Sequence, residues 1–230
     1  MSRSLVALLL AIPATALAHV SVASGAGTAN VSQEIAFGVG HGCSGADTYA
    51  VKISIPPGLT NVRTETSDFG RATVEVDGVG NVTAATWQKA DADLLPSDTA
   101  YYKLVIRAKL PNAPFTSLFF PTRQTCKSST GTLTVVDWVG TTVVVQDGGP
   151  QVEPAPQLRI VPARKPGWNK YAPTAAIADV SIYFADAQIL WRGTEAYSSN
   201  PETVAQLEKT SGVTRLTGGV SANQEIWVKY

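Results

Sequence analysis

One histidine near the start of the chain stands where it could bind a metal ion. The small-residue sequence Ala16-Leu17-Ala18 is typical of a signal peptidase site, and His19 follows it directly. Cleavage there would leave His19 as the first residue, with a free α-amine beside its own ring Nδ1. An α-amine has an ordinary pKa of about 8, so its neutral form is available near neutral pH. We therefore expect a chelating nitrogen pair that one further ligand would complete as a copper site.

The residues before this histidine predict an export signal. Arg3 supplies a positive charge, residues 5–12 form an apolar core, and Pro13 ends that core. The core is too short to span a bilayer, which needs about 20 apolar residues, and no later segment reaches that length. An uncleaved, buried N-terminal helix is the alternative. We predict a signal peptide over residues 1–18 and a soluble mature chain that is periplasmic or secreted.

The sulfur-containing residues restrict which metal could bind. Cys43 and Cys126 are the two cysteines, and an oxidising compartment favours a disulfide between them over two metal-binding thiolates. Closing so long a loop stabilises a fold by about 4 kcal/mol. The only methionine, Met1, would leave with the signal peptide, which argues against Met-rich Cu(I) sites and against a blue-copper site. Nitrogen and oxygen donors would favour copper(II).

Charge and length exclude some classes of partner. The chain has 18 basic and 18 acidic residues and no basic run, so it lacks the charge pattern of proteins that bind nucleic acid or anionic membranes. Removing the 18 leader residues from 230 would leave 212, enough for a sandwich and a second, smaller unit.

The first and larger part of the mature chain reads as β structure. From Val20 to about Gln146, short runs rich in Val, Ile, Thr and aromatic residues alternate with Gly, Pro, Asn and Asp. Within 102–109, alternate residues are apolar, as one buried sheet face requires. The Asp77-Gly78 and Gly80-Asn81 pairs predict a hairpin. We predict strands over 31–39, 48–55, 71–76, 81–87, 101–109, 118–123, 132–138 and 141–146, hence an all-β, immunoglobulin-like β-sandwich over residues 19–147.

The rest of the chain differs from the first part in composition and in its pattern of apolar residues. Residues 148–163 are rich in Gly and Pro and predict a linker. Residues 164–230 predict a small α+β domain, with a helix over 201–209 capped by Asn200, strands over 188–191 and 225–230, and either state over 175–185. Its many aromatic residues favour a core, with a binding platform as the alternative: Trp168, Tyr171, Tyr183, Phe184, Trp191, Tyr197, Trp227 and Tyr230.

Several short motifs together resemble a known family. They are Ala18-His19-Val20-Ser21-Val22, Gly40-His41-Gly42-Cys43, Phe119-Phe120-Pro121, Gln124-Thr125-Cys126 and Asp137-Trp138. In this order and spacing, over residues 19–146, the chain resembles the YcnI-like family of exported bacterial proteins. The resemblance implies an immunoglobulin-like or cupredoxin-like sandwich that binds Cu(II) through a single histidine and acts in copper acquisition, trafficking or homeostasis.

The resemblance also implies a set of site residues. His19 would bind copper through its amine and its ring, Asp137 would supply an oxygen, and Trp138 would line the site. The family has glutamate where this chain has Asp137, so the shorter side chain would need a closer strand or a bridging water. Adjacent strand residues point to opposite faces unless a bulge intervenes, so a solvated aspartate and a core tryptophan are the alternatives.

Two other functions remain open from the sequence. His41 could join His19 in a three-nitrogen copper monooxygenase site, although its glycine-rich loop also suits a turn or a supporting role. The sandwich could instead be an interaction module that works without metal. We expect a non-enzymatic copper carrier or sensor, whose partners would be the copper ion and either a membrane copper transporter or another periplasmic copper protein.

Overall fold

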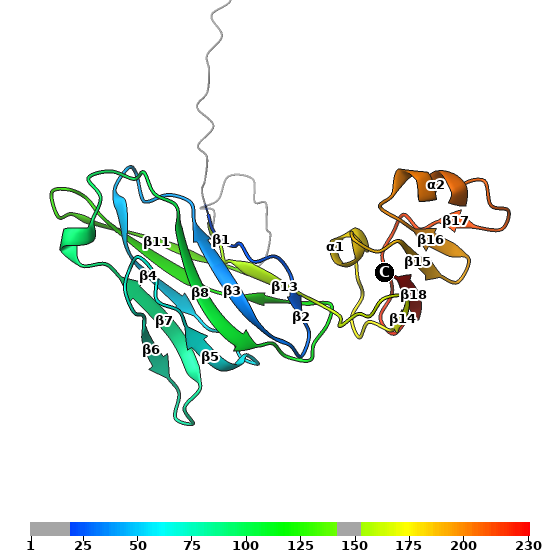
Figure 1. Ribbon diagram of the computed structural model, residues 1–230, viewed down its shortest axis with the longest axis horizontal. Coiled ribbons are helices and arrows are strands. Elements are labelled where there is room, and N and C mark those ends of the chain that lie inside the picture. The colour runs from blue at the N-terminus through cyan, green and yellow to red at the C-terminus, as the bar shows by residue number, and fades with distance from the viewer. Residues whose placement is uncertain (1–18, 142–152) are drawn as a thin grey trace, which may run out of the picture.

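The computed structural model describes residues 19–141 and 153–230, which form a β-sandwich followed by a smaller unit (Figure 1). The predicted signal peptide and the predicted strand over 141–146, apart from Thr141, lie outside the described residues. The sandwich contains two main sheets and a short third one. Its fold is the predicted all-β, immunoglobulin-like class.

The two main sheets pack face to face. The first has the strand order β1-β3-β8-β5 and the second has the order β12-β11-β10-β4-β7-β6. Strands of the first sheet are β1 (Val20–Val22), β3 (Ser32–Val39), β8 (Tyr102–Lys109) and β5 (Thr60–Thr64). Strands of the second are β12 (Glu153–Pro154), β11 (Leu133–Gly140), β10 (Thr122–Lys127), β4 (Asp47–Ser54), β7 (Val82–Gln88) and β6 (Thr73–Val76).

The alternation predicted for residues 102–109 is confirmed in β8. Tyr102, Leu104, Ile106 and Ala108 are buried, and the residues between them are exposed or half-buried. These side chains join Phe37, Trp87 and Phe120 in one hydrophobic cluster between the sheets.

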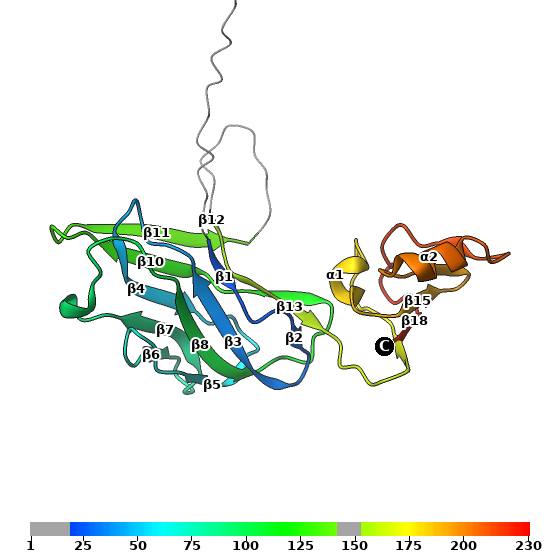
Figure 2. The ribbon, with the colours of Figure 1, turned by 45° about the horizontal axis from the view of Figure 1, so that its top comes forward.

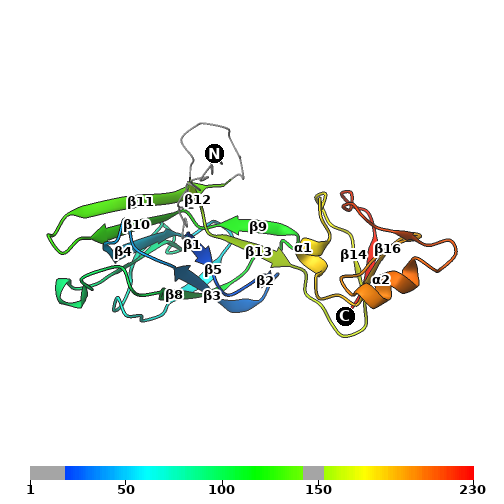
Figure 3. The same cartoon turned by 90° about the horizontal axis from the view of Figure 1, so that it is seen from above.

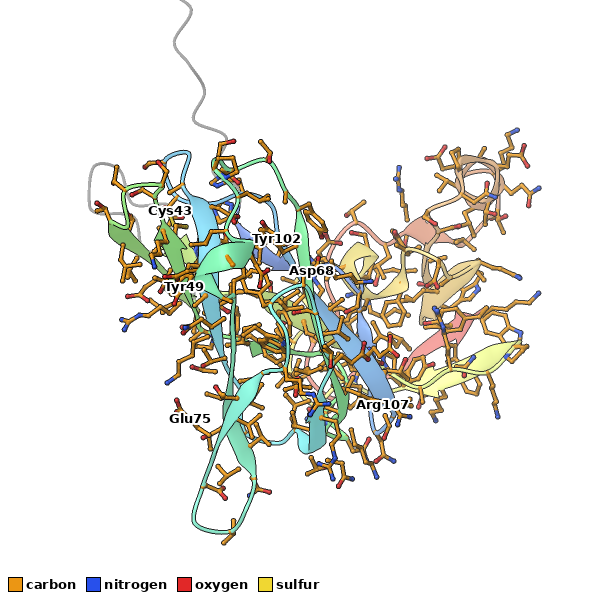
Figure 4. The ribbon with its side chains drawn as sticks, turned by 60° about the vertical axis from the view of Figure 1, so that its left-hand side comes forward. Cys43, Tyr49, Asp68, Glu75, Tyr102 and Arg107 are labelled. Atoms are coloured by element: carbon orange, nitrogen blue, oxygen red, sulfur yellow. A yellow bond between two sulfur atoms is a disulfide. The ribbon has the colours of Figure 1, made fainter. Side chains whose placement is uncertain are left out.

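The predicted hairpin joins β6 to β7, where the Asp77 carboxylate accepts hydrogen bonds from the backbone N–H groups of Val79 and Asn81. Glu75, on β6, lies near this hairpin (Figure 4).

A proline divides one predicted strand into two. The expected strand over 118–123 is instead β9 (Thr116–Phe119) and β10, which belong to different sheets. Pro121 lies between them and has no N–H for a strand ladder, so the chain changes sheet at this point. β9 pairs with β13 (Gln157–Val161), which also pairs with β2 (Gly27–Thr28).

The predicted linker over 148–163 is therefore partly strand. Leu158 and Ile160 are fully buried in the sandwich core, and Glu153 begins β12, so the sandwich extends to about residue 161. Proline content alone suggested a spacer, but the prolines flank β13 and leave its ladder N–H groups intact. The segment after β13 leads to the second unit, at the end of the sandwich where β9 and β13 lie (Figure 3).

The smaller unit surrounds a second hydrophobic cluster. Its sheet has the order β14-β18-β15-β16-β17, from β14 (Trp168–Tyr171), β18 (Ile226–Lys229), β15 (Ile189–Arg192), β16 (Glu195–Tyr197) and β17 (Thr214–Arg215). The predicted helix is α2 (Pro201–Leu207), capped by the Asn200 side chain as expected. The ambiguous stretch holds one turn of helix, α1 (Ser181–Phe184). Another short helix, η1 (Asp91–Asp93), lies in the sandwich.

Phe115 joins the two units. Its ring packs against Tyr171, Tyr183 and Phe184 of the smaller unit, and its carbonyl accepts a hydrogen bond from the Tyr183 hydroxyl. Among the described residues, no helix is long and apolar enough to cross a bilayer.

Candidate metal centre

His19 lies at one edge of the sandwich, immediately before β1. β1 pairs with β3 so that Val20 lies opposite Val39, and the edge strand β12 of the other sheet comes close to β1 here, together with its neighbour β11 (Figure 2). The His19 side chain is 35 % exposed, and Val20 beside it is buried. Burial of Val20 anchors the strand, so the histidine is held at a fixed place while its ring stays accessible.

Trp138 lies beneath this histidine. The two ring centroids are 5.2 Å apart and tilted by 55°. Trp138 is 3 % exposed, and its indole N–H donates a hydrogen bond to the Gln124 side-chain oxygen at 3.2 Å. The amide of Gln124 in turn donates to the His41 carbonyl and to the Thr48 hydroxyl. The tryptophan is thus fixed by packing and by a satisfied buried polar group, as buried indoles usually are.

The carboxylate nearest His19 belongs to Glu153. Its Oε2 lies 3.5 Å from the His19 Nε2. β12 runs parallel to β11 with Glu153 opposite Trp138, so both side chains lie on the same face of the sheet. The composition of 148–163 predicted a linker, and a two-residue strand carries no periodicity, so sequence reasoning missed Glu153. Glu153 lies near His19 because β12 pairs with β11, and no local sequence pattern predicts that pairing.

The predicted oxygen ligand, Asp137, lies elsewhere. Asp137 and Arg123 are direct partners across β11 and β10, and the guanidinium holds the carboxylate through two hydrogen bonds of 2.7 and 2.9 Å. The hydrogen bond from Arg123 lowers the pKa of Asp137 below its usual range. Because no bulge separates Asp137 from Trp138, the two side chains point to opposite faces, and we correct the assignment of Asp137 as a ligand that meets His19.

His41 is not gathered with His19 either. Its ring Nδ1 contacts the Gly42 carbonyl and lies 3.9 Å from Asp98 Oδ2. In the part of the chain that the structure describes, no three His, Cys, Asp or Glu side chains lie close enough together to hold a metal ion. A site at His19 would therefore depend on a donor beyond these side chains, and the histidine's own amine is the donor that cleavage would release.

The predicted disulfide between Cys43 and Cys126 is present and cross-links segments near the His19 edge of the sandwich. Cys43 and Cys126 are bonded, with Cα atoms 5.7 Å apart and a sequence separation of 83. The bond ties the loop that carries His41 to β10, the strand that also carries Gln124. It therefore holds together the segments that position Trp138.

The family model for a domain of unknown function, DUF1775, matches residues 19–160. The chain belongs to the DUF1775 family. The matched region runs from His19 into β13 and includes Glu153, so these two residues lie inside the DUF1775 domain. No curated protein matches the chain.

Solved structures support the fold of the DUF1775 domain. An uncharacterised protein from Nocardia farcinica with an immunoglobulin-like fold is 22 % identical, with a TM-score of 0.50, over 62 % of this chain and 98 % of that one. BcpA, the major pilin subunit of Bacillus cereus, is 9 % identical, with a TM-score of 0.35, over 92 % of this chain and 55 % of that one. The first likeness shows the fold, and the second is too weak to carry an argument.

Proposed function

We propose that this DUF1775 protein is YcnI-like and binds copper(II) at His19 outside the cytoplasm, as a carrier or sensor of the ion. The observation that carries the proposal is the arrangement at His19. This residue is half-exposed at a strand start, its ring lies over the fixed indole of Trp138, and its Nε2 faces Glu153. The family match begins at the same residue, which agrees with cleavage after Ala18.

The chemistry follows from which ring nitrogen faces the carboxylate. Glu153 faces Nε2, so a proton on Nε2 would be held there and Nδ1 would keep its lone pair. Nδ1 is the ring nitrogen nearer the main chain, and it lies beside the amine that cleavage would create. The two nitrogens of one residue would then bind one copper(II) ion, which forms the strongest complexes of the divalent first-row metals with such donors.

Glu153 and Trp138 would prepare this histidine for the ion. A carboxylate that accepts the second N–H of a metal-binding histidine fixes the ring and raises the basicity of the bound nitrogen. Trp138 supplies a rigid floor that limits how the ring can turn. Both roles are those of positioning residues, and the ion would keep open positions toward solvent.

A copper ion with open coordination positions can accept a ligand from another protein and be transferred to it. We propose a non-catalytic role in copper acquisition, trafficking or homeostasis in the periplasm or outside the cell. The partner would be a membrane copper transporter or another copper protein of that compartment, since either could add a ligand on the exposed side.

Competitive Cu(II) titration tests the proposal. A mature protein that begins at His19 should bind at least about tenfold more tightly than one with a single glycine before His19, because the glycine converts the amine into an amide. Affinity should also fall between about pH 7.5 and about pH 5, since both nitrogens must lose protons to bind. His41→Ala is the matched control and should bind as the unmodified protein does. Equal affinity of the glycine-extended protein would refute the proposal.

A further inference from the structure

The outer face of the smaller unit's sheet carries three tryptophans that no described element covers. Trp168 is 46 % exposed, Trp227 is 44 % exposed and Trp191 is half-buried. They line a groove of about 710 Å³ together with Gly193 and Glu225. Exposed apolar surface of this kind costs solubility and usually marks a contact site.

Strand pairing places the three indoles side by side. They come from the consecutive strands β14, β18 and β15, with Trp191 directly opposite Trp227 and Trp168 opposite Lys229, two residues along β18. Neighbouring strands lie about 4.8 Å apart, so the row of rings spans roughly two strand spacings. The side chains of Ile226, Val228 and Leu190 point the other way and fill the unit's core. The tryptophans are therefore not needed to build that core.

Two charged side chains beside the rings form an ion pair. Lys170 Nζ lies 2.5 Å from Glu225 Oε2 and 5.6 Å from the Trp227 ring centroid. The Trp227 indole N–H donates to Glu225 Oε1 at 2.8 Å. The hydrogen bond from Lys170 lowers the pKa of Glu225, so the carboxylate is charged at neutral pH. A ligand in this groove would meet flat apolar rings together with the Glu225 carboxylate and the Lys170 ammonium, and Lys229 lies on the same face of β18 as Trp227.

We propose that this groove binds a β-1,4-linked polysaccharide chain. Sugar rings with equatorial substituents present a flat C–H face to an indole and carry hydroxyl groups at their edges. Those hydroxyls both donate and accept hydrogen bonds, which matches the Glu225 carboxylate and the Lys170 ammonium. A row of rings along three strands suits an extended chain with several sugar units better than a single small molecule. Neither His19 nor copper enters this proposal.

Two other ligand classes fit the groove less well. A quaternary ammonium would need the negative face of an indole, and the Lys170 ammonium already lies over Trp227 and is paired with the one carboxylate of the groove. A proline-rich peptide also docks on aromatic grooves, but its prolines offer carbonyl acceptors and no N–H, so they would add no donor to those that Glu225 already has in Lys170 and Trp227.

Binding of defined oligosaccharides to the full mature chain tests the assignment. Intrinsic tryptophan fluorescence and calorimetry should detect binding of cellohexaose or chitohexaose, and maltohexaose, whose α-links curve the chain, should bind at least about tenfold more weakly. Trp191→Ala and Trp227→Ala should each weaken binding at least about tenfold. Trp227→Phe should retain part of it, since a smaller ring still stacks. Tyr101→Ala, at an exposed aromatic of the sandwich, should have no effect.

The outcomes separate the proposal from its rivals. Unchanged thermal unfolding of the Trp227→Phe and Trp191→Ala proteins would assign any loss of binding to the groove itself. Absence of binding to both β-linked hexasaccharides would overturn the proposal. So would equal binding by all variants, or groove binding by tetramethylammonium or a proline-rich peptide instead.

Discussion

The two units of this protein use tryptophan in opposite ways. At the edge of the sandwich, Trp138 is 3 % exposed, hydrogen-bonded to a buried glutamine, and covered by a half-exposed histidine. In the smaller unit, Trp168 and Trp227 stand out from a sheet whose other face already holds the core. In the sandwich, the tryptophan is buried and packs against the His19 ring. In the smaller unit, the tryptophans are exposed and themselves form the surface of the sheet.

Replacing the buried tryptophan and an exposed one with alanine, one at a time, should give the largest difference in the free energy of unfolding. Trp138→Ala should lower the free energy of unfolding by about 3–5 kcal/mol, because it empties a buried site. Trp227→Ala should change it by no more than about 0.5 kcal/mol, as expected of a surface substitution. Denaturant titration of both proteins measures the difference. Similar losses in the two variants would mean that the groove tryptophans also act as core.

The buried ion pair of the sandwich gives the next largest contrast. Lys89 Nζ lies 2.6 Å from Asp47 Oδ2, and both side chains are almost fully buried. Both also bond to the hydroxyl of Tyr102 on β8, and Figure 4 labels Tyr102. Lys89→Met would leave the Asp47 carboxylate buried without a cation and should cost about 3–5 kcal/mol. Lys52→Met, in the exposed pair with Glu75, is the matched control and should cost at most about 1 kcal/mol. Equal losses measured by denaturant unfolding would contradict this assignment.

The same pair makes the stability of the sandwich sensitive to acid. Burial opposes the charged form of Asp47, but hydrogen bonds from Lys89, Tyr102 and the Leu95 N–H outweigh it and lower the pKa of Asp47 below its usual value. A lowered folded-state pKa adds stability above the unfolded value of about 3.9, and this stability is lost as the pH falls through the folded value. Unfolding curves measured from about pH 6 down to about pH 3 should show that loss in the unmodified protein, and a smaller loss in Asp47→Asn measured alongside it.

Glu153→Gln should have an intermediate effect, confined to copper. Glutamine keeps an acceptor for the His19 Nε2 proton but removes the charge, so Cu(II) affinity should fall by about 10–100-fold, as is typical of carboxylates that orient a metal-binding histidine. Competitive titration measures this effect. An unchanged affinity would show that Glu153 does not position the histidine.

Asp137→Asn should have the smallest effect. Its carboxylate pairs with the exposed Arg123 on the other face of β11, so copper affinity should match that of the unmodified protein. A loss of affinity as large as that of Glu153→Gln, in the same titration, would restore Asp137 as part of the site.

The sequence predicted those features that local pattern controls. Alternation in residues 102–109 gave the buried face of β8, and Asn200 gave the start of α2. The disulfide, predicted from the two cysteines, is confirmed. The cleavage motif predicts His19 as a metal ligand, and this stays a prediction. The groove tryptophans were identified as aromatic residues of the unit, but burial on one sheet face or exposure on the other depends on tertiary packing.

Pairing between distant segments could not be predicted in the same way. Glu153 reaches His19 because a two-residue strand pairs in parallel with β11, and so short a strand has no periodicity. The family motif predicts Asp137 as the oxygen ligand, yet β11 has no bulge between Asp137 and Trp138, so the two side chains point to opposite faces. β9 and β10 are separate strands because the chain passes from one sheet to another at Pro121.

A crystal structure of the mature protein, beginning at His19 and loaded with one equivalent of Cu(II), would show directly whether this residue chelates the ion. We predict copper bonded to both the amine nitrogen and the Nδ1 of His19, with Nε2 still facing Glu153 and Trp138 beneath the ring. Copper bound by His41 or Asp137, or held without the His19 amine, would contradict it.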